Sequence, residues 1–385
     1  MILSHDPTQL PSNLPIPQDD GACLHLLRAP LPSLFLTATN GLQVDLASLD
    51  RTVLFFYPRT GIPGQPPALG FRGEEWDSIP GARGCTPHSC GYRDLFSQFT
   101  ALDIRVLGVS TNSHRHQSEF KARNHIPFDF LSDHALQLTR ALSLATFEFP
   151  TEPENPTTML ARAAWYVERD SRGVPRIVKV WYPIFPPNEN AQRVLAWLTR
   201  RSEISIRPAD PQNAADTAFI VQTLRQHWHD TAIWSLGRIY NVDRLPALIA
   251  LRRGEPVGLV TYSIDPGGYQ CEVVTLASNN TDGEGGVGSA LLDAAVNDAR
   301  LVGCKRVFLT TTNDNLRAIE FYHRQGWRMA ALHRGSMTKA RELKPSIPLV
   351  APNGIAIRDE IEFELMLDEP RYSYNGNEPF NAHTR

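Results

Sequence analysis

The sequence predicts a protein of two α/β domains. Its 385 residues exceed the size at which a single hydrophobic core usually stops growing. In the first half, strand-like apolar runs alternate with helical patterns, which is typical of a layered α/β domain. In the second half, consecutive strand-like runs precede a glycine-rich turn and an amphipathic helix. We expect the domain boundary near residue 202, where a helical pattern ends and a new strand begins.

In the first half, runs rich in β-branched and aromatic residues predict strands over 53–58, 104–110, 163–169 and 176–183. Helical periodicity predicts helices over 85–100, 114–124, 133–142 and 189–200. Proline clusters near the start of the chain and in two later segments, 61–80 and 150–156. We interpret 61–80 as a long surface loop and 150–156 as a loop before a strand.

In the second half, the same criteria predict strands over 204–209, 249–253, 256–264, 270–278, 305–313 and 361–367. Helices are expected over 211–227, 282–303 and 316–326. The polar ends of the chain are expected to be flexible tails. The predicted organisation is therefore a tail at 1–20, domains at 21–202 and 203–368, and a tail at 369–385.

Composition excludes several classes of protein. A net charge of −3 gives no sign of binding to nucleic acid or to an anionic membrane. No apolar run approaches the roughly 20 residues of a membrane-spanning helix. The first twenty residues lack the basic and apolar regions of a signal peptide. Five scattered cysteines, an odd number, argue against a disulfide framework. We therefore expect a cytoplasmic protein.

Two cysteines, Cys85 and Cys90, are the most informative local feature, in the run GCTPHSC at the start of a predicted helix. Backbone N–H groups at a helix N-terminus stabilise a thiolate, and nearby arginines such as Arg83 and Arg93 would help. This favours a redox-active nucleophile. The alternatives are an inert buried pair and a zinc site with His88, although zinc needs three or four ligands at closer spacings. We expect no metal.

The spacing of these cysteines has a mechanical consequence. Residues five apart in a helix are separated by about 7.5 Å along the axis and point in different directions. A disulfide requires Cα atoms roughly 4.4–6.8 Å apart. Cys85 and Cys90 therefore cannot bond unless this turn of helix unwinds, so that oxidation would be coupled to a conformational change.

The second half contains GEGGVGSALLDA, a glycine-rich turn that opens a helix. The unpaired N–H groups of such a turn form an anion site, and Gly286 and Gly288 let the backbone approach a pyrophosphate. Many glycine-rich turns are only turns. A dinucleotide site is disfavoured because the preceding strands are not in βαβ order.

Several motifs of the first half occur together and in order: FFYPRTG, GCTPHSCGYRDLFSQF, LGVSTNSHRHQSEFKARNHIPFDFLSD and RIVKVW. Over residues 20–200 the chain resembles the peroxiredoxins, and within them the bacterioferritin-comigratory or Q-type subgroup. The resemblance implies a thioredoxin-like fold, with Cys85 as the peroxidatic and Cys90 as the resolving cysteine. It also implies a peroxide substrate and a thioredoxin-like reductant. Arg162 would hold the thiolate, although alone it could equally be a surface ion-pair residue.

The chain departs from the family's PxxxTxxC pattern. About twenty extra residues follow FFYPRT, and Ala82 stands three before Cys85. Pro58 and Thr60 reach the site if the insertion loops out. Alternatively, Pro80 takes over the structural role and the threonine hydroxyl is lost, which would weaken substrate hydrogen bonding without removing the nucleophile.

In the second half, VTLAS, GGVGSALLDAAVNDAR and TTTNDNLRAIEFYHRQGWRMAALHRG resemble the GNAT acetyltransferase superfamily over residues 204–367. The resemblance implies an α+β fold and the substrate acetyl-CoA, with an amine acceptor that the sequence does not identify. The implied cofactor contacts are the glycine turn, the strand before it and an asparagine: Gly286, Val287, Gly288, Val274 to Leu276, and Asn313 or Asn315.

Two catalytic roles are also implied for the second half. Tyr322 would protonate the leaving thiolate, unless it is only a half-buried helix aromatic. Glu272 could deprotonate an amine through water, although strand alternation makes a solvent-facing side chain equally possible. Gly283 stands where the family usually has Arg or Gln, and Glu284 follows, which would weaken coenzyme binding.

The leading hypothesis is a bifunctional enzyme, a thioredoxin-dependent peroxidase followed by an N-acetyltransferase. A second interpretation makes the peroxiredoxin-like half a redox sensor or interaction module for the acetyltransferase. A third makes the second half an acyl-CoA-binding module without transfer. The departures at Ala82 and Gly283 keep these alternatives open.

Overall fold

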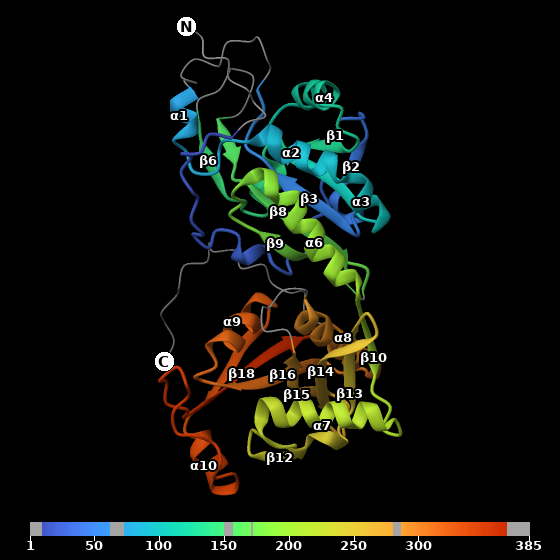
Figure 1. Cartoon of the computed structure of the whole chain (residues 1–385), viewed down its shortest axis with the longest axis vertical. Helices are drawn as coiled ribbons and strands as arrows, with labels where there is room; N and C mark the ends of the chain where they lie inside the picture. Colours follow the sequence, from blue (N-terminus) through green and yellow to red (C-terminus); the bar gives the residue numbers. More distant parts are fainter. Residues whose placement is uncertain (1–9, 62–72, 150–156, 171, 280–285, 368–385) are drawn as a thin grey trace. The chain divides into compact units, whose positions relative to one another are not determined.

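The computed structural model of the chain describes residues 10–61, 73–149, 157–170, 172–279 and 286–367. These residues form two compact units that divide between Ala196 and Trp197 (Figure 1). The division falls inside helix α6 (Asn190–Ser202), and we keep 21–202 and 203–368 as the proposed domain limits. Within the described ranges, no helix is both long enough and apolar enough to cross a membrane.

The first unit is built on a seven-stranded mixed sheet in the order β2-β1-β5-β4-β3-β8-β9. The three central strands β3, β4 and β5 are parallel, and the outer strands join antiparallel. The strands are β1 (Phe35–Ala38), β2 (Gln43–Asp45), β3 (Thr52–Phe56), β4 (Arg105–Ser110), β5 (Asp129–Ser132), β8 (Ala163–Arg169) and β9 (Pro175–Trp181). A separate pair comprises β6 (Thr146–Glu148) and β7 (Thr158–Leu160). Strands β1, β2, β5, β6 and β7 are absent from the sequence prediction.

Helices connect these strands: α1 (Gly73–Asp77), α2 (Cys85–Asp94), α3 (Phe96–Ala101), α4 (His114–Arg123), α5 (Gln137–Ala141) and α6. The helix predicted over 85–100 is interrupted at Leu95, whose N–H bonds to the carbonyl of Arg93 instead of one four residues back. The helix predicted over 133–142 begins late because the Asp133 carboxylate caps it, accepting from the N–H groups of Leu138 and Thr139. Residues 62–72 of the predicted surface loop 61–80 lie outside the described residues. The rest of this segment contains α1, and its Trp76 is buried in an apolar cluster, so this part is not an exposed loop.

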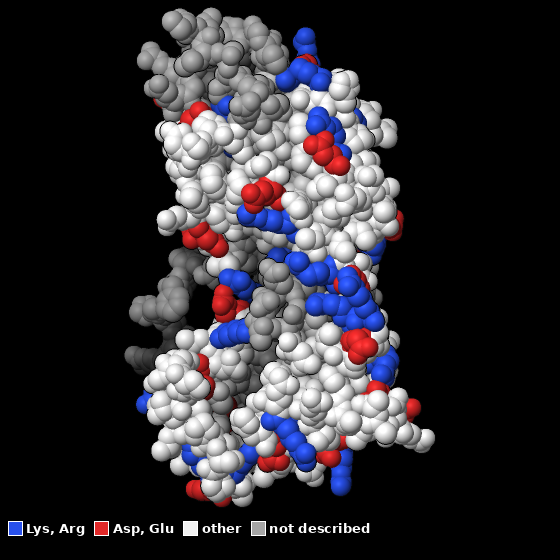
Figure 2. Space-filling view, viewed as in Figure 1, with Lys and Arg blue, Asp and Glu red and all other residues white. Residues whose placement is uncertain are grey.

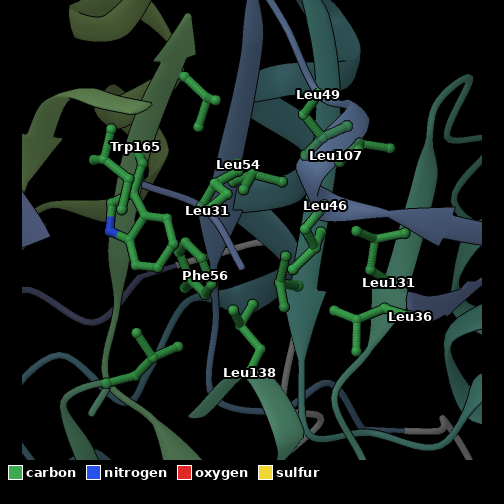
Figure 3. Packing of buried hydrophobic residues seen from close by; sticks show 14 of the residues in the cluster. Leu31, Leu36, Leu46, Leu49, Leu54, Phe56, Leu107, Leu131, Leu138 and Trp165 are labelled. Carbon is green, nitrogen blue, oxygen red and sulfur yellow. The ribbon is translucent and has the colours of Figure 1, made fainter. Parts of the chain in front are cut away.

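The core of this unit lies against β3 and β8. The ring centroids of Phe56 and Trp165 are 4.1 Å apart, and leucines from strands and from the segments between them extend the same cluster (Figure 3). On the other face of β3, Phe55 stacks on Tyr92 of α2 at 4.4 Å. Because successive residues of a strand face opposite sides, β3 is buried on both faces and anchors α2 directly.

The second unit is a seven-stranded sheet in the order β10-β13-β14-β15-β16-β18-β17. All neighbours are antiparallel except β15 and β16, which are parallel. The strands are β10 (Ile204–Pro208), β13 (Ala247–Arg252), β14 (Glu255–Ile264), β15 (Gln270–Ser278), β16 (Arg306–Thr312), β17 (Arg328–His333) and β18 (Glu360–Met366). A hairpin of β11 (Ala232–Ser235) and β12 (Arg238–Asn241) lies outside this sheet. The sequence prediction lacks β11, β12 and β17.

The helices of this unit are α7 (Ala214–Trp228), α8 (Val287–Val302), α9 (Leu316–Arg324) and the unpredicted α10 (Ser336–Leu343). Helix α8 packs with Val260 and Val273, whereas α7 packs with Leu259 on the opposite face. Gly258 of β14 makes room for α8, because a Cβ there would lie 2.7 Å from Cγ1 of Val287. This close contact between β14 and α8 fixes the N-terminus of α8 against the sheet.

Acidic and basic side chains are interspersed over the face in view in Figure 2, on a surface that is mostly uncharged. This agrees with the small net charge of −3.

Candidate active sites

Cys85 is the first residue of α2 and is 5% exposed. Gly84 before it caps the helix with φ near +102°, a conformation that glycine adopts without strain. Nη2 of Arg162 lies 3.3 Å from Sγ, and the thiol also lies 3.7 Å from the carbonyl oxygen of Ala82. The predicted cysteine and the predicted arginine are thus brought together.

Arg162 precedes β8 and is only 3% exposed, so the alternative of a surface ion-pair residue is wrong. Its guanidinium donates to three backbone carbonyls in the loop before Cys85, those of Gly81, Ala82 and Arg83. Since an arginine offers five N–H donors in a fixed plane, these contacts fix the loop and aim Nη2 at the sulfur.

The two arginines nearest in sequence do not serve Cys85 in the way we expected. Arg83 forms an ion pair with Asp77 at 3.3 Å. Arg93 pairs with Asp94 at 2.8 Å and donates to the carbonyl of Asn124. The contact to Sγ therefore comes from Arg162, more than seventy residues away in sequence.

Cys90 lies in the same helix, is half-buried, and is a free thiol, as is Cys85. Burial raises the pKa of the Cys90 thiol, and the nearby charge of Arg93 opposes this shift. The two thiols occupy one unbroken helix, so a disulfide between them requires this turn to unwind.

The threonine of the family pattern is displaced. Ala82 is fully buried in a small apolar cluster with Trp76, Phe149 and Met159. The hydroxyl of Thr60 lies 3.1 Å from Nε2 of His116, and its carbonyl is 2.7 Å from the same nitrogen. Among the described residues, no hydroxyl hydrogen-bonds to Sγ of Cys85.

Sequence reasoning missed two polar residues behind the thiol, Tyr92 and Asn190, and considered His88 only as a zinc ligand. Nδ1 of His88 is 2.9 Å from Nη1 of Arg162, and its Nε2 is 3.0 Å from Oδ1 of Asn190. The hydroxyl of Tyr92 donates to the same Oδ1 at 2.6 Å. His88 and Tyr92 stand three and seven residues after Cys85, on its side of the helix, a spacing that could have signalled them.

The N-terminal segment predicted as a flexible tail also reaches this site. A Cβ on Gly84 would lie 2.5 Å from Cγ of Pro187 and 2.7 Å from Cδ2 of Leu10. One on Gly81 would lie 3.5 Å from Cγ of Pro17. Part of this segment is therefore packed against the turn that carries Cys85.

In the second unit, the candidate site is a split between two parallel strands. β15 and β16 pair only from Gln270 to Val273 and from Arg306 to Leu309. Beyond that point, β15 continues with β14 alone and β16 with β18 alone. The predicted segment Val274 to Leu276 lies in the separated part of β15. Its backbone edge toward β16 is free of strand pairing among the described residues, as a ligand with amide groups requires.

The described part of the glycine turn lies at the N-terminus of α8. Gly286 caps the helix with φ near +70°, Val287 packs on the sheet, and a Cβ on Gly288 would lie 3.5 Å from Phe321. Nη1 of Arg201, in the same compact unit, lies 3.5 Å from the position of a Cβ on Gly286. Gly283 and Glu284 fall outside the described residues.

The two asparagines have structural partners. Asn313 accepts hydrogen bonds from the N–H groups of Arg358 and Asp359 and donates to the carbonyl of Ala356. Its side chain therefore closes a loop, which argues against a cofactor contact. Asn315 is exposed and caps α9 through the N–H of Ala318, so we keep only Asn315 as the proposed contact.

Tyr322 of α9 is 9% exposed and packs against the rings of Trp327 and Phe363. Burial raises the pKa of its phenol well above the ordinary value, so the group stays protonated at neutral pH. No hydrogen bond to its hydroxyl occurs among the described residues. The side chain is both a core aromatic and a protonated donor.

Glu272 points inward, not into solvent. It lies on β15 one residue before pairing with β16 ends, and it is 6% exposed. Ser235 donates to one carboxylate oxygen at 2.5 Å and Tyr240 to the other at 2.7 Å. Burial raises the pKa of the Tyr240 phenol, and the hydrogen bond to Glu272 and the charge of that carboxylate add to the shift.

A second buried carboxylate, Glu360 of β18, reaches the same hairpin through Nε1 of Trp234 at 3.2 Å. Burial raises the pKa of Glu360. Neither it nor the hydroxyl partners of Glu272 were predicted, although Glu360 stands immediately before the apolar run IEFELML, and an acidic residue at the start of a predicted strand was a usable signal. Among the described residues, no group of three or more His, Cys, Asp or Glu side chains is arranged to hold a metal ion.

Both candidate sites lie within segments of the chain that match known families. Residues 78–170 match the AhpC/TSA family, and residues 214–327 match the acetyltransferase (GNAT) family. These matches indicate an AhpC/TSA, or peroxiredoxin-like, domain followed by a GNAT domain in one chain. The predicted fold class is confirmed.

The individual relatives cover parts of the chain. An uncharacterized protein, YdhI of Bacillus subtilis, is 38% identical over 41% of this chain and 97% of its own length. A putative peroxiredoxin, bcp of Coxiella burnetii, is 29% identical over 28% of this chain and 57% of its own length. The crystal structure of peroxidoxin BcpB from Mycobacterium tuberculosis is 20% identical, with a TM-score of 0.35, over 45% of this chain and 96% of its own.

Proposed function

We propose that the chain is a bifunctional enzyme, a thiol peroxidase joined to an acetyl-CoA-dependent N-acetyltransferase. The observation that carries the first activity is the contact of 3.3 Å between Nη2 of Arg162 and Sγ of Cys85. The observation that carries the second is the split between β15 and β16, with a glycine-capped helix N-terminus in the same domain.

In the peroxidase, the Cys85 thiolate attacks one peroxide oxygen while the O–O bond breaks. The departing oxygen leaves as water or an alcohol after taking a proton, and Cys85 becomes a sulfenic acid. Arg162 stabilises the thiolate and the charge that develops on the peroxide. The start of α2 then unwinds, the Cys90 thiol displaces water, and a disulfide forms. A thioredoxin-like dithiol reduces it by exchange.

The experiment is peroxide consumption by the full chain with thioredoxin, its reductase and NADPH. We expect turnover in the wild type and none in Cys85→Ser. Cys90→Ser should reduce one equivalent of peroxide and stop as a trapped sulfenic acid. Wild-type protein without turnover, although its thiols are reduced, would overturn the peroxidase assignment and leave the first domain as a sensor or interaction module.

In the acetyltransferase, the free edge of Val274 to Leu276 would hold the pantetheine amides, and the N–H groups at Gly286 to Gly288 would hold the pyrophosphate. Arg201 would supply a positive charge there, which offsets the missing donor at Gly283. The anion site thus fits the residues present.

The chemical step is a direct transfer. The acceptor amine attacks the thioester carbonyl, the C–S bond breaks, and the amine proton passes to Glu272 through water. Tyr322 gives its proton to the leaving thiolate and regains one from solvent. Glu272 must release one of its hydroxyl partners to accept that proton, and we assign this role to the bond from Ser235.

The matching experiment has two parts, because the acceptor amine is not known. Calorimetry with acetyl-CoA tests binding, and release of free CoA thiol in the presence of a panel of primary amines tests transfer. We expect binding and transfer in the wild type, and binding without transfer in Glu272→Gln. Binding without transfer to any amine in the wild type would instead favour an acyl-CoA-binding module.

A further inference from the structure

Behind the reactive thiol lies a continuous line of polar side chains in an otherwise apolar region. It runs from Cys85 to Arg162, then to His88, Asn190 and Tyr92, with heavy-atom distances of 3.3, 2.9, 3.0 and 2.6 Å. Apart from Cys85, at 5%, each of these residues is 3% exposed or less. A buried polar line of this kind needs every member to be satisfied.

Donor and acceptor roles follow from the ends of the line. A guanidinium only donates, so Nδ1 of His88 must accept from Arg162. Nε2 therefore carries the proton and donates to Oδ1 of Asn190, which also accepts from the Tyr92 hydroxyl. The imidazole is thus held as one neutral tautomer. In agreement, burial and the charge of Arg162 hold the pKa of His88 well below its ordinary value.

The partners of Arg162 share one property. Among the described residues they are three backbone carbonyls, the neutral nitrogen of His88 and the sulfur of Cys85. None is a carboxylate, so its positive charge is not offset by an ion pair. A cation held by neutral acceptors acts on the nearest group that can become an anion, which here is the thiol.

We propose that His88 is a positioning residue for the Cys85 reaction: its Nδ1 holds the guanidinium of Arg162 against the sulfur without neutralising it. This proposal rests on the peroxidase function proposed above. Asn190 and Tyr92 fix the ring so that Nδ1 always faces the arginine. The competing explanation is a histidine that merely fills the core beside Phe55, whose ring lies 5.0 Å away.

The test compares three variants in a Cys90→Ser background. His88→Leu fills the space but removes the acceptor. His88→Asn places an amide oxygen near the position of Nδ1 and is the rescue variant. Thr52→Val is the matched control, because it removes the hydrogen bond of a buried threonine, to the carbonyl of Asp50, at the other end of β3. Thermal unfolding identifies any variant that fails to fold.

The first readout is the rate at which iodoacetamide alkylates Cys85, followed by mass spectrometry from neutral to alkaline pH. The second is the rate of peroxide reduction. We expect His88→Leu to lower the neutral-pH alkylation rate by about tenfold, the effect of one lost hydrogen bond to a charged group. The difference between the two proteins should become smaller as the pH is raised. His88→Asn should recover most of the rate, and Thr52→Val should match the background protein.

Equal alkylation rates in folded His88→Leu and the background protein would overturn the positioning role. So would a loss in His88→Leu that His88→Asn does not repair. Failure of the peroxidase function gives a different result, because alkylation then still depends on His88 while no variant reduces peroxide.

Discussion

Nη2 of Arg162 lies 3.3 Å from Sγ of Cys85, although 77 positions separate the two residues. The same nitrogen donates to the carbonyls of Ala82 and Arg83. One guanidinium therefore fixes the backbone that leads into α2 and faces the nucleophile at its start. The position of the loop and the electrostatic environment of the Cys85 thiol therefore both depend on the side chain of Arg162.

Replacing the side chain of Arg162 should slow the proposed reaction at Cys85 much more than the replacement of another buried arginine does. We expect Arg162→Leu to lower kcat/KM for peroxide by about a hundredfold, the effect of losing a preorganised charge at a reaction centre. Stopped-flow measurement of peroxide reduction checks this. Arg176→Leu is the matched control, because Arg176 is also a buried arginine of the first domain, on the edge strand β9, but pairs with Asp170. A fall of less than threefold in Arg162→Leu, or an equal fall in the control, would contradict the prediction.

His88 should make the first domain sensitive to mild acid. Its pKa in the folded state lies well below 6.5, whereas the unfolded chain takes up a proton near 6.5. Below pH 6.5 the unfolded state therefore binds one more proton, and stability falls as pH falls, by up to about 1.4 kcal/mol per pH unit. The contribution is fully present above pH 6.5 and is lost toward the folded pKa.

The measurement is urea unfolding of wild type and His88→Asn at pH 7 and pH 5.5. Other histidines titrate equally in both proteins and cancel in the difference. The wild type should lose more stability than the variant between these pH values. Parallel losses would show that His88 becomes protonated in the folded protein.

Arg201 is expected to act on the pyrophosphate of the coenzyme. Arg201→Gln should raise KM for acetyl-CoA by about tenfold and leave kcat unchanged, as expected for one lost hydrogen bond to an anion. The effect should vanish with acetyl-pantetheine, which lacks the pyrophosphate. Arg253→Gln is the control, since Arg253 pairs with Glu203 on the surface. An equal rise with both substrates would place Arg201 elsewhere in the mechanism.

Tyr322 should affect transfer but not binding. Tyr322→Phe preserves the ring that packs on Trp327 and Phe363, so the fold and the acetyl-CoA dissociation constant should stay unchanged. Loss of the general acid should lower kcat by about a hundredfold. Thiol release and calorimetry measure the two quantities, with Tyr269→Phe, an exposed tyrosine, as control. Unchanged kcat would reduce Tyr322 to a core aromatic.

The sequence predicts the long, strongly patterned elements of this fold and the residues that family motifs mark. Short strands such as β2 and β11 are too brief for periodicity to register. The orientation of Glu272 could not be predicted, because the register of β15 shifts near Val274 and breaks the alternation of faces.

The polar residues that lie behind Cys85 could not be predicted from the sequence for a different reason. In the sequence, nothing distinguishes His88 and Tyr92 from other helix residues. Their role depends on Asn190, about a hundred positions later, whose Oδ1 accepts hydrogen bonds from both. From the sequence, Ala82 indicated only the loss of the threonine hydroxyl of the family pattern. In the structure, its small side chain packs in the apolar cluster around Trp76. Such roles depend on contacts distant in sequence, which local patterns do not contain.

Two glycines, Gly84 at the N-cap of α2 and Gly91 within it, affect how quickly the proposed disulfide can form. A Cβ on Gly84 would meet Pro187 at 2.5 Å, and one on Gly91 would meet the carbonyl oxygen of Asn188 at 3.2 Å, so the helix is seated closely at both points. Unwinding of the helix must first break these close contacts. Until it does, a sulfenic acid at Cys85 cannot react with Cys90. A second peroxide molecule can use that delay to form the sulfinic acid, which ordinary thiols do not reduce. If the first domain has the proposed peroxidase activity, this tight packing predicts an enzyme that works at low peroxide and inactivates itself when the oxidant is abundant.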